Sequence, residues 1–426
     1  MIERVQPGPR TGRVSIPASK SRAHRLLICA ALSGQETELI CQGISKDIEA
    51  TMACLRGMSV EITQTGDCIR VAPGPWSKEK KVVLPCGESG STLRFLLPVV
   101  GALGLQGEFR MEGRLPQRPL QPLWDLLEMH GMDLRQEGER LDFSGQLRPG
   151  YYEIPGNISS QYVSGLLFAL PLLAGESSLK VTGAVESADY IAMTEDALRQ
   201  FGLLLSGEGY SYQIPGGGYP AAAIAARQGL RVESDWSSAA FFLSLGALSP
   251  AGVTVTGMDL SSRQGDRRIL KLLTGFGAEV TAAAEEITVR RGEMHGQRID
   301  AAAIPDLVPI LAVVAASCPG ETIIEHAERL RLKESDRLMA VSTMLNALGA
   351  EVRERIDGLE IIGSSHLAGG EVSSFNDHRI AMSAAVAASL CQHPVIIQGA
   401  ESTEKSFPGF WEKLKEMTIV KGGGAA

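Results

Sequence analysis

The sequence predicts an α/β protein of two globular domains, each built from three βαβαββ repeats with buried, parallel first helices. This arrangement is an inside-out α/β barrel, and a cleft is expected between the domains. Three observations support it. The chain has 426 residues, which is long for one hydrophobic core. Six apolar helix patterns recur at roughly 60–70 residues, too far apart for a stacked solenoid. Each is followed by a short β-like run and then by an amphipathic helix pattern.

The first helix of each repeat is apolar on every side, as in "SQYVSGLLFALPLL" and "WSSAAFFLSLGAL". Such a helix has to be buried all round, which suggests that three of them pack together in each domain. The β-like runs that follow include "TELICQG", "SLKVTG" and "PVIIQG". The six helices are expected to begin near Lys20, Ser89, Ser160, Trp236, Pro305 and Asp377.

The second helix of each repeat has one apolar face, because its apolar residues recur at i, i+3 and i+4. A strand pair with a polar turn is expected after it, as in "SVEITQTGDCIRVAP". The six amphipathic patterns lie within residues 47–58, 121–132, 191–205, 266–280, 335–352 and 407–418.

The sixth repeat lacks its closing strands, and the N-terminal segment "IERVQPGPRTGRVSIPA" is expected to supply them as a hairpin. Both termini then belong to the second domain. The chain is expected to cross into the first domain near Ser19 and to return near Arg227, after the Ala/Gly-rich segment 214–229. The predicted domains are therefore 19–227, and 1–18 with 228–426. Two crossings make a hinge, and a cleft beside a hinge is a natural ligand site.

Composition limits the classes of partner. The formal net charge of −8 argues against nucleic acid or an anionic membrane, so an anionic ligand must be held by a local cluster of cations. The seven cysteines form no C-x-x-C pair, and the sequence shows neither a secretory leader nor an apolar run of about 18 residues. A cytoplasmic protein is expected. Nucleotide-binding glycine motifs and metal-ligand spacings are absent from the sequence, so no nucleotide and no metal are expected.

Polar residues gather where the buried helices begin, and there the unpaired N–H groups and the helix dipole favour an anion. Ser159 and Ser160 are possible N-caps that could also hold a phosphate, and the polar Gln161 follows them. Gly90 would let a backbone N–H approach a ligand closely. Plain capping without a ligand is the alternative. Cations at equivalent ends of the repeats are Lys20, Arg25, Arg118, Lys333, Arg337, Arg379 and Lys405.

Two carboxylates stand among these cations, Asp306 in "IPDLVP" and Glu334 in "LKESDR". Either could act as a general base, and either could instead cap a helix or balance charge. His24 and His378 are expected to be structural, hydrogen-bonded histidines.

Nine short motifs spread over the chain resemble the 5-enolpyruvylshikimate-3-phosphate (EPSP) synthase family. The motifs are "SKSRAHR", "GESGSTLRF", "QRPL", "ISSQY", "VESADYI", "IPDLVP", "LKESDRL", "NDHRIAM" and "EKSFPGF". The resemblance implies transfer of the enolpyruvyl group of phosphoenolpyruvate to the 5-hydroxyl of shikimate 3-phosphate, with release of phosphate. The reaction passes through a tetrahedral adduct and needs no cofactor or metal. The two small anions are the expected partners, and a monomer is expected.

The resemblance also implies roles for single residues. Catalytic roles fall to Lys20, Asp306 and Glu334, with Asp306 as the base on the 5-hydroxyl and Glu334 a candidate for proton exchange at the methylene. Shikimate 3-phosphate is expected to contact Lys20, Ser21, Arg25, Ser159, Ser160, Gln161, Ser187, Asp306 and Lys333. Phosphoenolpyruvate is expected to contact Lys20, Gly90, Arg118, Arg337, Arg379 and Lys405.

Three positions depart from the common family pattern, namely Glu88, Phe95 and Arg329. They put the local geometry beside phosphoenolpyruvate in question, but not the reaction. Two alternatives stay open. A UDP-N-acetylglucosamine enolpyruvyl transferase would share fold and donor, but it typically carries Lys-Asn in place of "SKS" and a cysteine in the loop that here reads "GRLPQRPL". A non-catalytic repeat scaffold would have no use for so many cations beside two acids.

Overall fold

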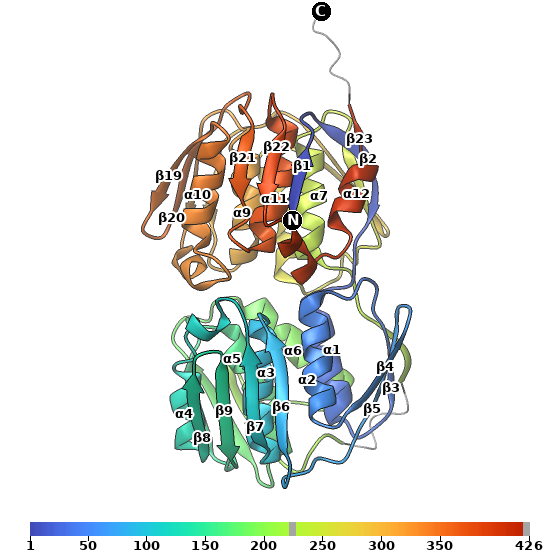
Figure 1. Ribbon diagram of the computed structural model, residues 1–426, viewed down its shortest axis with the longest axis vertical. Coiled ribbons are helices and arrows are strands. Elements are labelled where there is room, and N and C mark those ends of the chain that lie inside the picture. Colours follow the sequence, from blue (N-terminus) through green and yellow to red (C-terminus); the bar gives the residue numbers. More distant parts are fainter. Residues whose placement is uncertain (221–226, 421–426) are drawn as a thin grey trace, which may run out of the picture. The chain divides into compact units, whose positions relative to one another are not determined.

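Helices and strands alternate along the chain in the computed structural model, which describes residues 1–220 and 227–420 (Figure 1). Its internal contacts define two units: unit 1 contains residues 1–19 and the chain from Glu233 onward, and unit 2 contains residues 20–232. The return crossing was expected near Arg227. Instead, β13 (Arg227–Arg231) pairs in parallel with β3 (Thr37–Ile40) of unit 2, so the division follows Val232. Residues 221–226 of the expected crossing segment lie outside the described residues.

The six buried helices predicted from the apolar patterns are present. In the helix that begins at Trp236, every residue except Ser237 is buried, as its lack of a polar face requires. The third and sixth buried helices each run directly into a 3₁₀ turn. The six are α1 (Lys20–Leu32), α3 (Gly90–Leu103), α5 (Ser160–Ala169), α7 (Trp236–Ala247), α9 (Val308–Ala315) and α11 (His378–Ala387).

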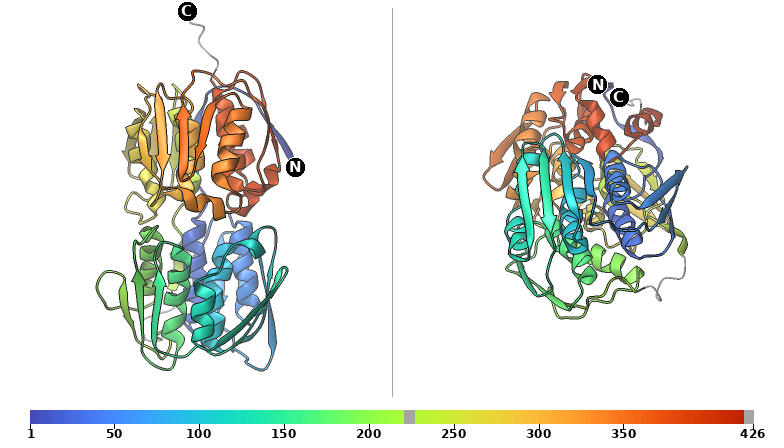
Figure 2. Two further views of the ribbon diagram at one scale, coloured as in Figure 1. Left: turned by 90° about the vertical axis from the view of Figure 1, so that its left-hand side faces the viewer. Right: turned by 60° about the horizontal axis from the view of Figure 1, so that its bottom comes forward.

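Within each unit the buried helices pack side by side, with strands toward the outside (Figure 2). In unit 1, α7, α9 and α11 contact one another. In unit 2, α3 packs on α5 so closely that a Cβ on Gly165 would lie 2.3 Å from the carbonyl oxygen of Arg94. Only glycine fits at that position, because real Cβ atoms do not approach backbone oxygen so closely.

The second helices lie at the predicted positions, and each buries one face. In α2, for example, Ile48, Met52 and Leu55 are buried, at the spacing that one face of a helix requires. Several of these helices contact sheet strands directly, for example α10 against β19 (Glu351–Arg355) and α4 against β8 (Met132–Glu137). The six are α2 (Lys46–Gly57), α4 (Leu123–Met129), α6 (Ala188–Gln200), α8 (Ile269–Gly275), α10 (Arg337–Ala347) and α12 (Phe410–Glu416).

The three sheets of unit 2 share one plan. In each, the strand that follows the buried helix pairs in parallel with a leading strand and antiparallel with the last strand of the repeat. The orders are β13-β3-β5-β4, β6-β7-β9-β8 and β10-β11-β12. The further strands are β4 (Glu61–Thr65), β5 (Cys68–Ala72), β6 (Lys81–Gly87), β7 (Gln106–Met111), β9 (Arg140–Gly145), β10 (Tyr151–Pro155), β11 (Ser177–Thr182) and β12 (Ser211–Ile214).

Unit 1 repeats this plan in three further sheets, of orders β15-β16-β14-β2-β23, β17-β18-β20-β19 and β1-β22-β21. Its strands are β1 (Ile2–Val5), β2 (Arg10–Ser15), β14 (Val253–Thr256), β15 (Glu279–Ala283), β16 (Glu286–Arg290), β17 (Arg298–Asp300), β18 (Glu321–Glu325), β19, β20 (Gly358–Ile362), β21 (Gly370–Ser373), β22 (Val395–Gln398) and β23 (Thr418–Ile419).

The N-terminal segment is not the hairpin that the sequence suggested. Strand β1 pairs with β22 and closes the sixth repeat, whereas β2 pairs in parallel with β14 of another sheet. The two neighbouring strands are thus divided between two sheets. Strand β2 directly precedes α1 in the chain but pairs with β14, the strand after α7. Strand β13 directly precedes α7 but pairs with β3, the strand after α1. At the two crossings, each strand thus pairs in the sheet of the other repeat.

The third repeat is shorter than expected. After α6 its sheet has a single strand, β12, and Ser206 makes only an isolated bridge to Gln213. The segment "LLLSGEGYSYQIP" therefore supplies one strand where the pattern suggested two. Within the described part of the chain, no helix has the length and apolar character needed to cross a membrane.

Candidate functional site

Polar caps stand where several of the buried helices begin, so these helix starts are built from the residues that the sequence singled out. The Ser89 hydroxyl accepts a hydrogen bond from the Thr92 N–H at the start of α3, and the Ser159 hydroxyl accepts one from the Gln161 N–H at the start of α5. A side-chain cap satisfies one of the four N–H groups that a helix start leaves unpaired. Donors therefore remain at these starts for an anion.

Gly90, the first residue of α3, lies beneath two guanidinium groups. A Cβ added there would lie 2.7 Å from Nη1 of Arg94 and 2.8 Å from Nη1 of Arg118. Arg118 follows the 3₁₀ turn Leu115–Gln117, and Arg94 is one helical turn beyond Gly90. Because Gly90 has no side chain, both guanidinium groups can lie against the start of α3, where the helix dipole already favours a negatively charged ligand.

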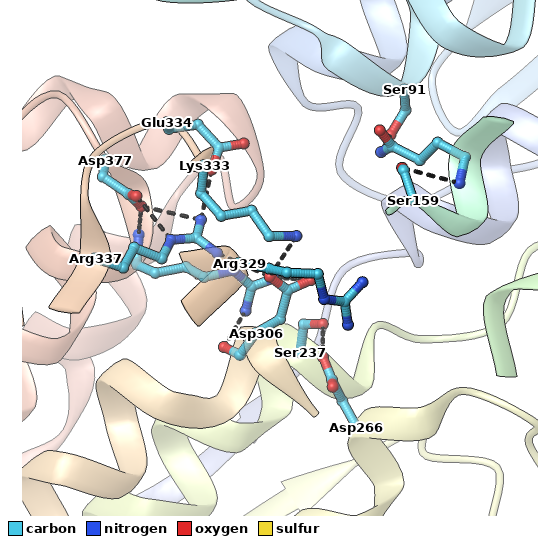
Figure 3. A network of polar contacts seen from close by, with 12 residues as sticks. Ser91, Ser159, Ser237, Asp266, Asp306, Arg329, Lys333, Glu334, Arg337 and Asp377 are labelled. Carbon is cyan, nitrogen blue, oxygen red and sulfur yellow. Dashed lines mark hydrogen bonds and ion pairs between the residues drawn. The ribbon is translucent and has the colours of Figure 1, made fainter. Parts of the chain in front are cut away.

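Arg94 joins this cluster to the start of α5. Its Nη1 donates to Oε1 of Gln161 (3.0 Å), and Nε2 of Gln161 donates to the hydroxyl of Ser91 (2.9 Å). Figure 3 shows Ser91 and Ser159 in this network. Arg94 was not among the predicted site residues, although the sequence carries one signal for it: an arginine inside an otherwise apolar helix, four residues after Gly90.

Lys20, the first residue of α1, pairs with a carboxylate of the next helix. Its Nζ lies 2.8 Å from Oδ2 of Asp47, and the two side chains are 16% and 15% exposed. Asp47 was not among the predicted site residues. The pair fixes the direction of the lysine while leaving part of it accessible.

Arg25 is the most deeply buried of the residues predicted to contact shikimate 3-phosphate, at 2% exposure. Its guanidinium donates to the carbonyl oxygens of Ser21 (2.7 Å) and Tyr190 (2.8 Å) and to the Thr194 hydroxyl (2.8 Å). It also lies 5.0 Å from the ring centre of Phe95. Burial lowers the pKa of Arg25 to about 9. In this structure the side chain ties α1 to α6, and its role toward a phosphate stays a prediction.

His24 is buried, and Nδ1 lies 2.6 Å from the Thr51 hydroxyl. Burial, followed by the charges of Lys20 and Arg25, puts the pKa of His24 well below its usual value, so the ring is neutral. The Thr51 hydroxyl lies 2.6 Å from the Thr92 hydroxyl, and the Thr92 hydroxyl donates to that of Ser89, the cap of α3 (2.7 Å). This is the hydrogen-bonded structural histidine that the sequence suggested.

In unit 1, Arg337 forms ion pairs with three carboxylates (Figure 3). Arg337 is 1% exposed; Nε donates to Asp377 (2.8 Å), Nη1 to Asp306 (2.8 Å) and Nη2 to Glu334 (2.7 Å). Burial acts to lower its pKa, but Asp377, Glu334 and Asp306 together raise it above the usual value. The guanidinium therefore holds the two candidate acids, Asp306 and Glu334, in place.

Asp306 stands in the 3₁₀ turn Pro305–Leu307 and faces two more cations. Nη2 of Arg379 lies 3.4 Å from Oδ2, and Nζ of Lys333 lies 3.9 Å from Oδ1. Burial works to raise the pKa of Asp306, but Arg379, Lys333 and Arg337 hold it well below its usual value. The structure thus brings five predicted residues of unit 1 together: Asp306, Lys333, Glu334, Arg337 and Arg379.

The remaining predicted residues take these positions. Nζ of Lys405, at the end of the 3₁₀ turn Ala400–Lys405, donates to the Asn376 carbonyl oxygen (2.7 Å). Ser187 precedes α6 with a left-handed backbone (φ 54°) and is buried, as is Ser160. His378 is buried, with Nδ1 4.0 Å from Oδ1 of Asp377.

Asp266 is a further buried carboxylate, which was not among the predicted site residues, and it accepts a hydrogen bond from the Ser237 hydroxyl (Figure 3). Burial, followed by the nearby charge of Asp306, raises the pKa of Asp266 to about 6. The pKa of an aspartate in an unfolded chain is about 3.9. The folded protein therefore loses stability from this group as the pH rises from about 4 to about 6, and the loss is complete above that.

We expect Asp266→Asn to remove this loss. The free energy of unfolding of the variant minus that of the natural chain should increase as the pH rises from about 4 to about 6 and stay constant above. Urea unfolding at a series of pH values measures it, with the exposed Glu285→Gln as the matched control. A pH-independent difference would show that Asp266 ionises normally in the folded protein.

Comparison with known proteins places the chain in one family. The sequence model of the EPSP synthase (3-phosphoshikimate 1-carboxyvinyltransferase) family matches residues 5–414. A 3-phosphoshikimate 1-carboxyvinyltransferase of Clostridium kluyveri is 40% identical over 97% of this chain and 96% of its own length. One of Clostridium perfringens (strain ATCC 13124) is 41% identical over 98% of this chain and 99% of its own.

Solved structures agree with the sequence relatives. An EPSP synthase structure from Acinetobacter baumannii superposes with a TM-score of 0.79 at 27% identity, covering 98% of both chains. The enolpyruvyl transferase NikO from Streptomyces tendae shares the fold, with a TM-score of 0.76 at 17% identity and 99% of both chains covered. With a family match over nearly its whole length and relatives about 40% identical, the chain belongs to the EPSP synthase family.

Proposed function

We propose that this enzyme transfers the enolpyruvyl group of phosphoenolpyruvate to the 5-hydroxyl of shikimate 3-phosphate and releases phosphate, and that the two clusters described above carry out the transfer. The observation that carries the proposal is the family match over residues 5–414, joined to cations and acids at the helix starts of both units. The absence of a cysteine from residues 113–120 speaks against the UDP-N-acetylglucosamine reaction. A monomer in the cytoplasm stays a prediction.

The helix starts of unit 2 suit the phosphate groups. For shikimate 3-phosphate we propose Ser159, Ser160 and Ser187, with Ser21 and Arg25 behind them and Gln161 toward the ring. For phosphoenolpyruvate we propose Gly90 and Arg118, with Arg94 as an additional cation because it shares the surface of Gly90. Guanidinium groups bind phosphate and carboxylate through paired hydrogen bonds.

The residues of unit 1, together with Lys20 of unit 2, supply charge and proton transfer. In the addition step the 5-hydroxyl oxygen bonds to C2 of phosphoenolpyruvate and loses its proton to Asp306, while the methylene carbon gains a proton. Lys20 and Glu334 are the candidates for that second transfer. In the elimination step the methyl carbon loses a proton and phosphate departs. Arg379, Lys405 and Lys333 offset the charge of the substrates, and Arg337 keeps both acids oriented.

Asp306 is a weak base in the unliganded protein, since the surrounding cations hold its pKa low. The substrates carry two phosphates and a carboxylate, and we propose that these anions neutralise Arg379 and Lys333 on binding. The pKa of Asp306 then rises toward a value suited to accepting a proton. Substrate binding would in this way switch on the base.

The test of the overall reaction is phosphate release. Release is expected when phosphoenolpyruvate and shikimate 3-phosphate are supplied together, and neither substrate alone should give it. UDP-N-acetylglucosamine in place of shikimate 3-phosphate serves as the control and should give none. Phosphate release with that nucleotide sugar would favour the alternative transferase, and no release with either acceptor would contradict both.

A substitution at Gly90 tests the proposed phosphoenolpyruvate half of the site. The Cβ of Gly90→Ala would displace the flexible ends of Arg94 and Arg118, without touching the backbone. We expect an unchanged melting temperature, an unchanged KM for shikimate 3-phosphate and a KM for phosphoenolpyruvate raised about tenfold, equivalent to about 1.4 kcal/mol.

A double-mutant cycle is the control for Gly90→Ala. If the new methyl acts by moving Arg118, then adding it to an Arg118→Met chain should cost little more than Arg118→Met alone. Fully additive losses would show that Gly90 acts in some other way.

A further inference from the structure

A cavity of about 390 Å³ lies in unit 1 between the two ends of the chain. Its walls come from β1, the start of β2, helix α12 and strand β23. None of the residues proposed for enolpyruvyl transfer lines it. Cavities of this size hold molecules as large as an amino acid or a sugar phosphate.

Arg10 lines this cavity, and its guanidinium group is buried. Its side chain is only 6% exposed, and its one hydrogen bond to a described residue runs from Nη2 to the carbonyl oxygen of Gln6 (3.0 Å). Its Nε is buried without a partner, and among the described residues no carboxylate lies within ion-pair distance of it. Burial lowers the pKa of Arg10. A buried charge is normally paired, because removing it from water costs several kcal/mol.

The other charges around the cavity do not balance Arg10. Arg4 and Lys415 also line it, and Glu3 is the one carboxylate among the described residues of the lining. Glu3 is already engaged by Lys415, whose Nζ lies 3.1 Å away. Three cations and one carboxylate leave the cavity with a positive excess that suits an anion.

Apart from Gln6, the other residues that line the cavity are apolar. Trp411, Leu414 and Met417 are each less than 5% exposed and line the cavity together with Val5. The indole N–H of Trp411 donates to the carbonyl oxygen of Ala400 (3.1 Å), so its hydrogen-bonding capacity is already used. Trp411, Leu414 and Met417 thus offer contact to carbon atoms and no further hydrogen-bond donor, whereas Arg10 offers charge.

We propose that this terminal cavity, formed by β1, β2, α12 and β23, binds a small organic anion whose carboxylate or phosphate pairs with Arg10 and whose apolar body rests on Trp411 and Leu414. The ligand would join the first strands of the chain to its last helix, and it would pair a buried cation that the protein itself leaves unpaired. The proposal does not depend on the roles given to the residues of the transfer reaction.

Calorimetric titration of the full chain tests the proposal with four probes. Benzoate and phenyl phosphate carry both an apolar ring and a charge and differ in the charged group. Inorganic phosphate carries charge alone, and benzyl alcohol carries the ring alone. We expect one of the first two to bind with a stoichiometry of one and to raise the melting temperature, and the other two to bind at least about tenfold more weakly, since each lacks one contact.

Variants locate the binding. Arg10→Met should weaken it by about tenfold or more, while Arg13→Met, on the same strand but exposed, should not. Lys20→Met should also leave it unchanged, which separates this cavity from the transfer site. Val5→Trp keeps Arg10 and fills the cavity, so it should abolish binding even if Arg10→Met does not fold. Absence of binding by both ring-bearing anions, or equal binding by the natural chain and Val5→Trp, would overturn the proposal.

Discussion

Lys20→Met is expected to lower kcat by about 10²–10⁴-fold, the range that a positioned proton-transfer group contributes. The lysine starts α1, and its Nζ is held 2.8 Å from Asp47. Methionine keeps the length and apolar stem of the side chain but removes the charge that we assign to both substrates. The melting temperature should fall, because the variant leaves the largely buried carboxylate of Asp47 without its ion-pair partner, so turnover is compared at a temperature at which the variant is folded.

Two variants separate the role of Lys20 from that of its surroundings. Lys46→Met removes an exposed lysine next to Asp47 and should leave kcat unchanged. Asp47→Asn keeps Lys20 but removes the charged partner that orients its side chain, so kcat should fall by less than in Lys20→Met. Near-normal turnover in a folded Lys20→Met protein would remove the lysine from the mechanism.

Helix burial was predictable because it depends on local pattern. A helix with no polar face has no stable place except an interior, so segments such as "WSSAAFFLSLGAL" indicated their own burial. The amphipathic helices were predictable for the same reason, since residues three or four apart share a face whatever the rest of the chain does.

Strand pairing at the chain ends was not predictable in this way. Residues 2–15 contain two β-like runs around "PGP", and local proximity favours a hairpin. The partners β22 and β14 lie far along the chain, and no local spacing encodes them. Nothing in the local sequence indicates that β1 and β2 belong to different sheets. The pairing of β1 with β22, which closes the sixth repeat, is seen only in the fold.

The partners of the site residues were likewise hidden. Asp47, Arg94 and Asp377 contact Lys20, Gln161 and Arg337 across elements that are distant in sequence. Asp377 was noted at the start of a helix, but its capture of a buried guanidinium depends on how α10 packs on α11. Residue types at helix starts could thus be predicted, whereas the side chain that each one contacts required the fold.

Asp306→Asn is expected to lower kcat by about 10²–10⁴-fold, while KM for phosphoenolpyruvate changes only a few-fold. Asparagine keeps the shape of the side chain and can still accept from Nη1 of Arg337, but it cannot take the proton of the 5-hydroxyl. Arg337 retains Glu334 and Asp377, so the fold should persist. Steady-state kinetics with each substrate varied in turn measures both constants.

The matched control for Asp306→Asn is Asp300→Asn. Asp300 is an exposed carboxylate at the end of β17, and its partners within the described part of the chain are His326 and the backbone N–H of Ala302. The kcat of Asp300→Asn should equal that of the natural chain. If Asp306 is purely structural, a different result is expected. The loss of one carboxylate from around the buried Arg337 would then loosen the cluster, lower the melting temperature and raise both KM values. A stable variant that loses kcat alone therefore distinguishes a base from a charge-balancing group, because only the base acts on the transition state without changing the unliganded protein.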